Sequence, residues 1–102
     1  MAVRLSYVQQ FGSKIARRDI GWKCHYCHVP LTRVQHGTLA PPYNQATIDH
    51  IHPISRGGNK HDTDNMVLCC YACNKEKGVM DHVRFYRKKA LVRAMRRILG
   101  AR

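Results

Sequence analysis

The chain has 102 residues, 44% of them hydrophobic and 24% charged, a composition typical of one folded domain and not of a disordered tail. No apolar run is long enough to cross a bilayer and no secretion signal is recognisable, so we expect a cytoplasmic protein without membrane contact. The net charge of +12 indicates a polyanionic partner, and nucleic acid is favoured over solubility alone.

The charge is distributed unevenly along the chain. Residues 1–23 carry five basic groups against one acidic group, and residues 75–102 carry ten against two. Residues 24–74 hold three of each and have no net charge. A neutral centre between two basic flanks predicts that chemistry gathers in the centre while the flanks contact phosphates.

The first part of the chain predicts one helix followed by irregular structure. Apolar residues near helical spacing predict a helix over residues 3–18, although Gly12 weakens that pattern. Residues 22–32 are expected to form a tight hairpin. Residues 33–45, with two adjacent prolines, are expected to form a loop.

The central part predicts two short strands and a short helix. A strand is expected over residues 46–51, before Pro53, and a second one over residues 65–69. A turn over residues 55–59 separates them, and a helix over residues 71–77 follows, closed by Gly78.

The last part predicts a longer helix over residues 82–99, with Asp81 as its N-cap. One side of this helix is apolar and is expected to pack on the core; it carries Val83, Ala90, Ala94 and Ile98, flanked by Tyr86, Leu91 and Met95. A second side is expected to form a cationic stripe of Lys89, Arg93 and Arg96.

The cysteines form two pairs with metal-binding spacing. Cys24 and Cys27 form one C-x-x-C pair, and Cys70 and Cys73 form the second, so four thiolates can surround one ion. Such a shell is typical of structural Zn²⁺, because it leaves no coordination position open. The fifth cysteine, Cys69, is expected to be a buried strand residue instead of a ligand.

Residues 24–28 also have the C-x-x-C-H spacing of c-type haem attachment. That chemistry requires an exported protein and leaves Cys70 and Cys73 without a role, so zinc is favoured.

Asp49, His50 and Asn74, all in the neutral centre, are expected to lie around one cleft. Asp49 and His50 stand near the end of the first strand, Asn65 opens the second, and Asn74 follows Cys73 on the short helix. Neighbours on a regular strand point to opposite faces, so Asp49 and His50 can serve one phosphate only where the strand is ending. Pro53 favours such an end.

Two runs of sequence, residues 47–58 and residues 65–78, resemble the signature of the HNH endonuclease family, and the resemblance covers residues 17–78. It implies an α+β fold, the ββα-metal unit, stapled by a four-cysteine zinc and flanked by two helices. We therefore expect a single domain over residues 1–102, with its core at residues 24–78 between a basic N-terminal and a basic C-terminal helix.

The resemblance also implies a role for each residue of the cleft. His50 matches the general base that takes a proton from the attacking water, and an unperturbed imidazole, with a pKa of about 6.5, is mostly neutral near pH 7. Asn65 matches the residue that steadies the catalytic loop. Asp49 and Asn74 match the ligands of a catalytic divalent ion. Many members have histidine in place of Asn74, and a neutral amide oxygen favours Mg²⁺ or Mn²⁺ over Zn²⁺.

The expected activity is phosphodiester hydrolysis by a metal-dependent DNA endonuclease or nickase, acting on duplex DNA. Its phosphate contacts are expected at Arg56, Lys75, Lys77, Lys89, Arg93 and Arg96. By analogy, a small nuclease of this type fits a phage or mobile element and leaves room for a larger phage or restriction-type partner protein.

Two other functions remain open at this stage. A non-catalytic, zinc-stapled nucleic-acid-binding module would use the same charges but would not need Asp49, His50 and Asn74 together. An RNA-directed nuclease would use the same residues, because phosphate contacts carry no base information.

Overall fold

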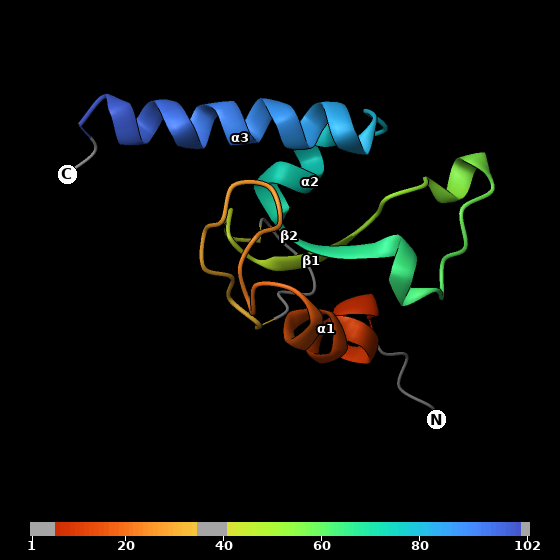
Figure 1. Ribbon diagram of the computed structural model, residues 1–102. Helices are drawn as coiled ribbons and strands as arrows, with labels where there is room; N and C mark the ends of the chain where they lie inside the picture. The colour runs from red at the N-terminus through yellow and green to blue at the C-terminus, as the bar shows by residue number, and fades with distance from the viewer. Residues whose placement is uncertain (1–5, 35–40, 101–102) are drawn as a thin grey trace.

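The computed structural model describes residues 6–34 and 41–100, and within them the predicted elements are present. They are, in chain order, α1 (Tyr7–Arg18), β1 (Ala46–His50), β2 (Met66–Cys70), α2 (Tyr71–Lys77) and α3 (His82–Ile98) (Figure 1). Two short 3-10 turns, Ile54–Arg56 and Thr63–Asn65, lie between the strands. The fold is α+β, as the sequence predicts. Residues 3–5 of the first predicted helix and residues 35–40 of the predicted loop lie outside the described residues.

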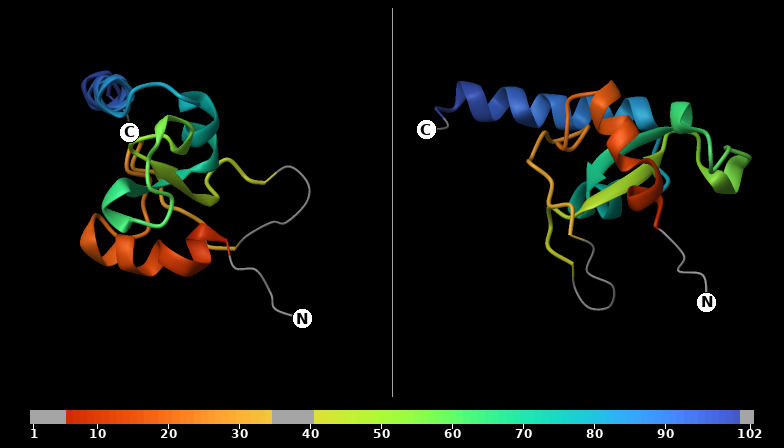
Figure 2. Two further views of the ribbon diagram at one scale, coloured as in Figure 1. Left: turned by 90° about the vertical axis from the view of Figure 1, so that its right-hand side faces the viewer. Right: turned by 90° about the horizontal axis from the view of Figure 1, so that it is seen from below.

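The strands β1 and β2 form one antiparallel hairpin that separates two layers of the molecule. Ala46 pairs with Cys70 and His50 pairs with Met66, and every residue of β2 is buried. Helix α1 covers one face of the hairpin, and α2 and α3 lie on the opposite side (Figures 1 and 2). A strand covered on both faces is expected to be apolar throughout, which explains the uninterrupted run of β2.

Helix α1 begins with a reciprocal cap and packs on the hairpin. The Ser6 side chain accepts from the Gln9 backbone, and the Gln9 side chain accepts from the Ser6 backbone. Ile15 lies against Met66 and Leu68 of β2. A Cβ atom at position 12 would lie 2.6 Å from the Trp22 ring. The glycine that weakens the helix pattern is therefore what lets Trp22 approach α1.

Helix α2 continues β2 without a loop. Cys70 is both the last residue of β2 and the N-cap of α2, where its sulfur accepts from the Cys73 backbone. The zinc-type spacing of these two cysteines is thus a strand-to-helix junction.

Helix α3 corrects one sequence prediction. Its N-cap is Asp81, as predicted, but Phe85 is its only buried residue. Val83, Leu91, Met95 and Ile98, expected on a packed face, are all exposed. The reason is geometric: the first part of α3 covers the hairpin, and the rest extends past the end of the core (Figures 1 and 2). Among the described residues, no helix is long and apolar enough to cross a membrane.

Candidate metal centre and active site

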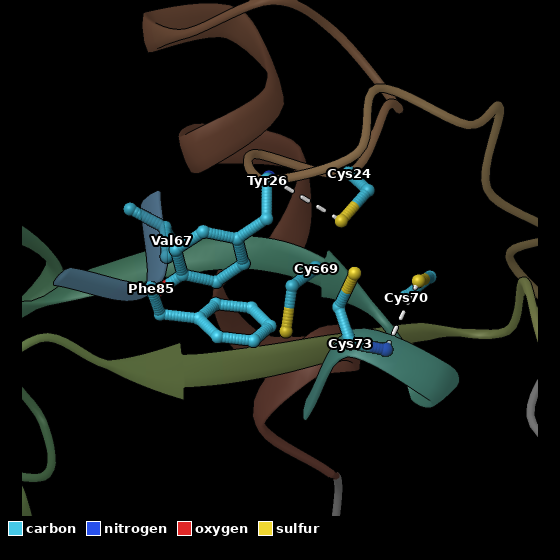
Figure 3. Close-up of a cluster of buried hydrophobic side chains, with 7 residues drawn as sticks. All are labelled: Cys24, Tyr26, Val67, Cys69, Cys70, Cys73 and Phe85. Atoms are coloured by element: carbon cyan, nitrogen blue, oxygen red, sulfur yellow. Dashed lines mark hydrogen bonds between the residues drawn. The ribbon is translucent and has the colours of Figure 1, made fainter. Parts of the chain in front are cut away.

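The four predicted zinc ligands converge on one point. The sulfur atoms of Cys24, Cys27, Cys70 and Cys73 all lie within 4.8 Å of one another. The Cys27 and Cys70 sulfurs are 3.8 Å apart. Four sulfurs at a Zn–S distance of about 2.3 Å in a tetrahedron are separated by about 3.8 Å, so the residues fit this ion. Figure 3 shows three of these cysteines, which come from the first knuckle, β2 and α2.

Backbone amides prepare the first cysteine of each pair for the thiolate state. Cys24 accepts from the amides of Tyr26 and Cys27, and Cys70 accepts from that of Cys73. The neighbouring thiols, Cys27 first among them, hold the pKa of Cys24 far below its usual range because they donate to its thiolate. Each pair therefore presents a sulfur that already accepts backbone hydrogen bonds.

Cys69 is separate from this cluster, as predicted. It is fully buried (Figure 3). Its sulfur lies 3.3 Å from the Thr47 hydroxyl. Burial raises the pKa of this thiol, so it stays protonated. Because Cys24 and Cys27 belong to the four-sulfur cluster, the haem alternative has no support here.

The cationic stripe of α3 turns toward the cysteines and not only toward solvent. Lys89 donates to Glu76 at 2.6 Å, and it lines one hollow together with Cys27, Cys70 and Cys73. Arg93 donates to the Tyr26 carbonyl at 2.9 Å. Zn²⁺ with four thiolates carries two excess negative charges, and two cations beside it offset them. This explains why Lys89 and Arg93 face inward, while Arg96 stays exposed.

The α2-facing side of the hairpin encloses Asp49. This carboxylate accepts from the Tyr26 hydroxyl at 2.5 Å and from the Lys77 ammonium at 3.3 Å. The side chains of Asp49 and Lys77 are 8% and 1% exposed. The Tyr26 hydroxyl also lies 3.0 Å from Nδ1 of His82, which links the first knuckle, β1 and α3.

Protonation in this cluster follows from burial. Burial, and then the hydrogen bond to Asp49, raises the pKa of Tyr26 far above its usual value, so the hydroxyl keeps its proton. The Tyr26 hydroxyl donates its single proton to Asp49. Nδ1 of His82 therefore donates to the Tyr26 hydroxyl oxygen. Burial lowers the pKa of His82, which favours its neutral form.

The opposite, α1-facing side of the hairpin holds His50. Its Nε2 lies 3.1 Å from the Lys60 carbonyl, and its ring meets the Tyr7 ring edge-on at 5.2 Å between centroids. A carbonyl can only accept, so Nε2 carries the proton and, in the neutral ring, Nδ1 has the free lone pair. Tyr7 belongs to α1 and lies also beside His61.

Asn65 closes the loop that follows His50. Its side chain accepts from the His52 backbone at 2.8 Å and donates to the carbonyls of His52 and Asn59. The His52 ring donates to the Arg56 carbonyl. At Gly58 a Cβ atom would collide with the His52 carbonyl, so this tight loop requires glycine there.

Asn74 lies on the same side as Asp49. Its side-chain amide donates to the Thr47 hydroxyl at 3.1 Å and to the Ile48 carbonyl at 3.3 Å. These bonds fix the orientation of the amide, because the nitrogen must face the two acceptors. The Asn74 oxygen therefore faces away from β1.

The structure does not gather Asp49, His50 and Asn74 around one cleft. Strand β1 ends at His50, as expected, yet Asp49 and His50 both belong to the ladder and face opposite sides. Within residues 6–34 and 41–100 their contacts share no partner. Lys77 is also corrected, because a buried, ion-paired ammonium is not available to a phosphate.

Two contacts of these residues have no signal in the sequence. Tyr26 stands between two cysteines, where it reads as a spacer, and it is 23 residues from Asp49. Tyr7 reads as one apolar position of a helix. Only the tertiary arrangement brings both tyrosines to the candidate site.

Comparison with known families agrees with this architecture. The model of the HNH endonuclease family matches residues 24–79, which is more than half of the chain. The chain belongs to the HNH endonuclease family, and this membership supports a nuclease-type activity on nucleic acid in general. No curated protein matches the chain at a significant level.

Proposed function

We propose that this protein is a metal-dependent endonuclease or nickase that hydrolyses phosphodiester bonds of duplex DNA, and that residues 1–102 act as one nuclease domain. The observation that carries the proposal is the hydrogen bond between Nε2 of His50 and the Lys60 carbonyl. A neutral imidazole with Nε2 bound to the Lys60 carbonyl has Nδ1 as its basic atom, which is what a general base requires.

The proposed reaction begins at the end of β1. A phosphate lying across this end has the His50 ring on the α1-facing side of the hairpin. Nδ1 takes the proton of the attacking water as the water oxygen bonds to phosphorus, and the Lys60 carbonyl stabilises the resulting imidazolium through Nε2. The bond from phosphorus to the 3′ oxygen breaks, and this oxygen leaves as a hydroxyl after taking a proton from solvent. Asn65 is a positioning residue, because its three bonds fix the loop that supplies this carbonyl. Family members of this kind leave 5′-phosphate and 3′-hydroxyl ends.

The structural metal fits and the catalytic metal does not. Zn²⁺ would be held by the four cysteines and would tie the first knuckle to α2. Asp49 and Asn74 have the oxygen chemistry that Mg²⁺ or Mn²⁺ prefers. As arranged, however, both oxygens of Asp49 already accept hydrogen bonds, one of them from a cation. This set of residues does not bind a divalent ion in the arrangement described.

Phosphate contacts are proposed for the exposed members of the predicted set, Arg56, Lys75 and Arg96. Arg56 lies in the loop that Asn65 closes, where its carbonyl accepts from the His52 ring. Lys89 and Arg93 are proposed as weaker DNA contacts, because Lys89 is ion-paired with Glu76 and Arg93 donates to the Tyr26 carbonyl.

A second function is favoured by the enclosure of Asp49. A zinc-stapled module that binds nucleic acid without cleaving it would not need this carboxylate free, and the ion pair with Lys77 would then be structural. The two functions differ in one measurable property, the production of nicked DNA.

Cleavage of supercoiled plasmid tests the proposal. The wild type and His50→Ala are compared with Mg²⁺, with Mn²⁺ and with a chelator at a level that leaves the zinc content unchanged. Metal-dependent nicking that His50→Ala loses supports the enzyme and its base. Salt-sensitive binding with no cleavage under any condition supports the non-catalytic module. Competition by structured RNA separates DNA from RNA as the substrate.

A further inference from the structure

Two of the five tyrosines line one hollow and are not used by the fold as ring partners. Tyr7, Tyr26 and Tyr86 each pack against another aromatic ring. Tyr43 and Tyr71 contact no other ring within residues 6–34 and 41–100. They line a hollow of about 400 Å³ together with Pro41, Ala72, Lys75 and Glu76. This volume lies within the range of ligand-binding clefts.

Backbone hydrogen bonds hold the two sides of this hollow together. The Ala72 amide donates to the Tyr43 carbonyl, and the Tyr71 amide donates to the Gln45 carbonyl, each at 3.0 Å. The chain before β1 is thereby fixed against the start of α2, while the Tyr43 side chain stays 64% exposed. A surface formed in advance loses less conformational freedom when a ligand binds. Because these amides of α2 are already bonded, side chains decide what the hollow binds.

The hollow adjoins the one beside the cysteine cluster, and the two share Tyr43, Ala72 and Glu76. We call the two hollows together the tyrosine groove. The charge of Glu76 in their shared wall is offset by ion pairs with Lys88 and Lys89. Lys75 lines one hollow and Arg96 the other, and both are exposed without an acidic partner among the described residues. The groove therefore has unpaired positive charge beside exposed aromatic rings.

Aromatic rings beside cations match the chemistry of an unpaired nucleotide. Its base stacks on a ring and its phosphates contact lysine or arginine. The bases of a duplex are already stacked on their neighbours, so a duplex offers this groove only phosphates. A proline-rich peptide also binds aromatic grooves, but it does not require the two free cations. The net charge of +12 likewise favours a polyanion.

We propose that the tyrosine groove binds unpaired bases of a single-stranded segment of the substrate, with Tyr43 and Tyr71 as its stacking residues. The inference rests on the proposed function for the cleaved duplex and extends it to a substrate in which a single strand adjoins that duplex. The groove lies beside the Ala46 end of β1, and His50 is at the other end. Four strand steps of about 3.3 Å separate these ends, so the groove selects the substrate and does not hold the cleaved nucleotide.

The affinities for three forms of one DNA test the stacking. The zinc-loaded protein, without added Mg²⁺ or Mn²⁺, is titrated with a fully paired duplex, with the same duplex carrying a short single-stranded extension, and with that extension lacking its bases. Fluorescence anisotropy measures each affinity. The extension with bases should bind at least about fivefold more tightly than the abasic one, the effect of one stacked base. Both extensions carry the same phosphates, so the comparison isolates stacking.

Variants of Tyr43 connect this preference to the groove. Tyr43→Ala should remove most of the preference for the extension with bases and leave the affinity for the fully paired duplex unchanged. Tyr43→Phe is the matched control, because it keeps the ring and should keep the preference. Tyr86→Ala, at a tyrosine of α3 outside the groove, should keep it too. Equal binding of the two extensions, or a preference that Tyr43→Ala leaves unchanged, overturns the proposal and favours a peptide as the occupant.

Photocrosslinking locates the contact in the unaltered protein. The extension carries 5-iodouracil, which crosslinks to an aromatic side chain in contact with it, and mass spectrometry identifies the crosslinked residue. We expect Tyr43 or Tyr71. Crosslinks found only at residues outside the groove, such as Tyr86, contradict the assignment.

Neither readout requires cleavage, which separates this inference from the proposed function. Base-dependent binding at Tyr43 by a protein that never nicks DNA would remove the endonuclease and keep the groove. Nicking by a protein that binds the two extensions equally would keep the endonuclease and remove the groove.

Discussion

The two faces of the β1–β2 hairpin carry neighbouring residues in opposite states. On the α2-facing side, Asp49 is enclosed and both of its oxygens have donors from the protein. On the α1-facing side, His50 is half-buried, and among the described residues only its Nε2 has a hydrogen bond, to the Lys60 carbonyl. The fold thus satisfies the charge of Asp49 internally, whereas it leaves Nδ1 of His50 without a hydrogen bond among the described residues.

The largest expected effect is that of losing the four-cysteine metal site, which joins the first knuckle to α2. Cys73→Ala should lose zinc and unfold the core, because binding energy at a structural zinc site is folding energy. Zinc content and circular dichroism measure this. Cys69→Ala is the matched control, since Cys69 is a buried cysteine outside the cluster and should keep its zinc. A folded, zinc-free Cys73→Ala would remove the structural role of the metal.

The next effect concerns the α1-facing side alone. His50→Ala should reduce cleavage by roughly 10²- to 10⁴-fold, the usual contribution of a general base, with zinc and DNA binding retained. His61→Ala is the control, because His61 is exposed and lies beside the same tyrosine. Equal losses in the two variants would contradict the special role of His50.

The sequence was sufficient for the elements that local rules decide. The apolar run of β2, the glycine after α2 and the aspartate before α3 set boundaries within a few residues, because caps and strand patterns act over short distances. The spacing of the two cysteine pairs predicts their meeting for a similar reason. One ion with four ligands constrains the fold more strongly than the intervening chain does.

The burial of charged residues was not predictable in this way. Lys77 at a helix end and Lys89 on a basic helix follow the pattern of solvated lysines. Their partners, Asp49 and the cysteine cluster with Glu76, are brought near only by the tertiary fold. The prediction that the apolar side of α3 packs on the core was wrong for the opposite reason. The apolar pattern is present, but the core ends before most of the helix can pack on it.

Breaking the ion pair tests how much the enclosed side stabilises the fold. Asp49→Asn leaves the Lys77 ammonium buried without its counter-charge and should lower the free energy of unfolding by about 3–5 kcal/mol. Urea denaturation of the zinc-loaded protein measures this. Asp64→Asn, at an exposed carboxylate, should change the free energy by about 0.5 kcal/mol or less. An equally small effect at Asp49 would mean that the pair is solvated in solution.

The contact between α1 and the proposed base predicts a smaller effect. Tyr7→Ala removes the ring that packs edge-on against His50 and should reduce kcat by about tenfold, as expected for an aromatic contact of about 1.4 kcal/mol. Tyr7→Phe keeps the ring and should retain nearly full activity. The KM for DNA should change little, since Tyr7 positions the base and does not bind substrate in this proposal. A loss in KM alone would make Tyr7 a substrate contact.

The smallest effect compares an exposed cation with one held by the protein. Arg56→Ala should lower the slope of log affinity against log salt concentration by about 1, because each phosphate contact releases roughly one counterion. Lys89→Ala should leave this slope nearly unchanged, since Lys89 is bound to Glu76 beside the cysteine cluster. Filter binding to duplex DNA across a range of salt concentrations measures both slopes. If Lys89→Ala has the larger effect, Lys89 exchanges its ion pair with Glu76 for a phosphate when DNA binds.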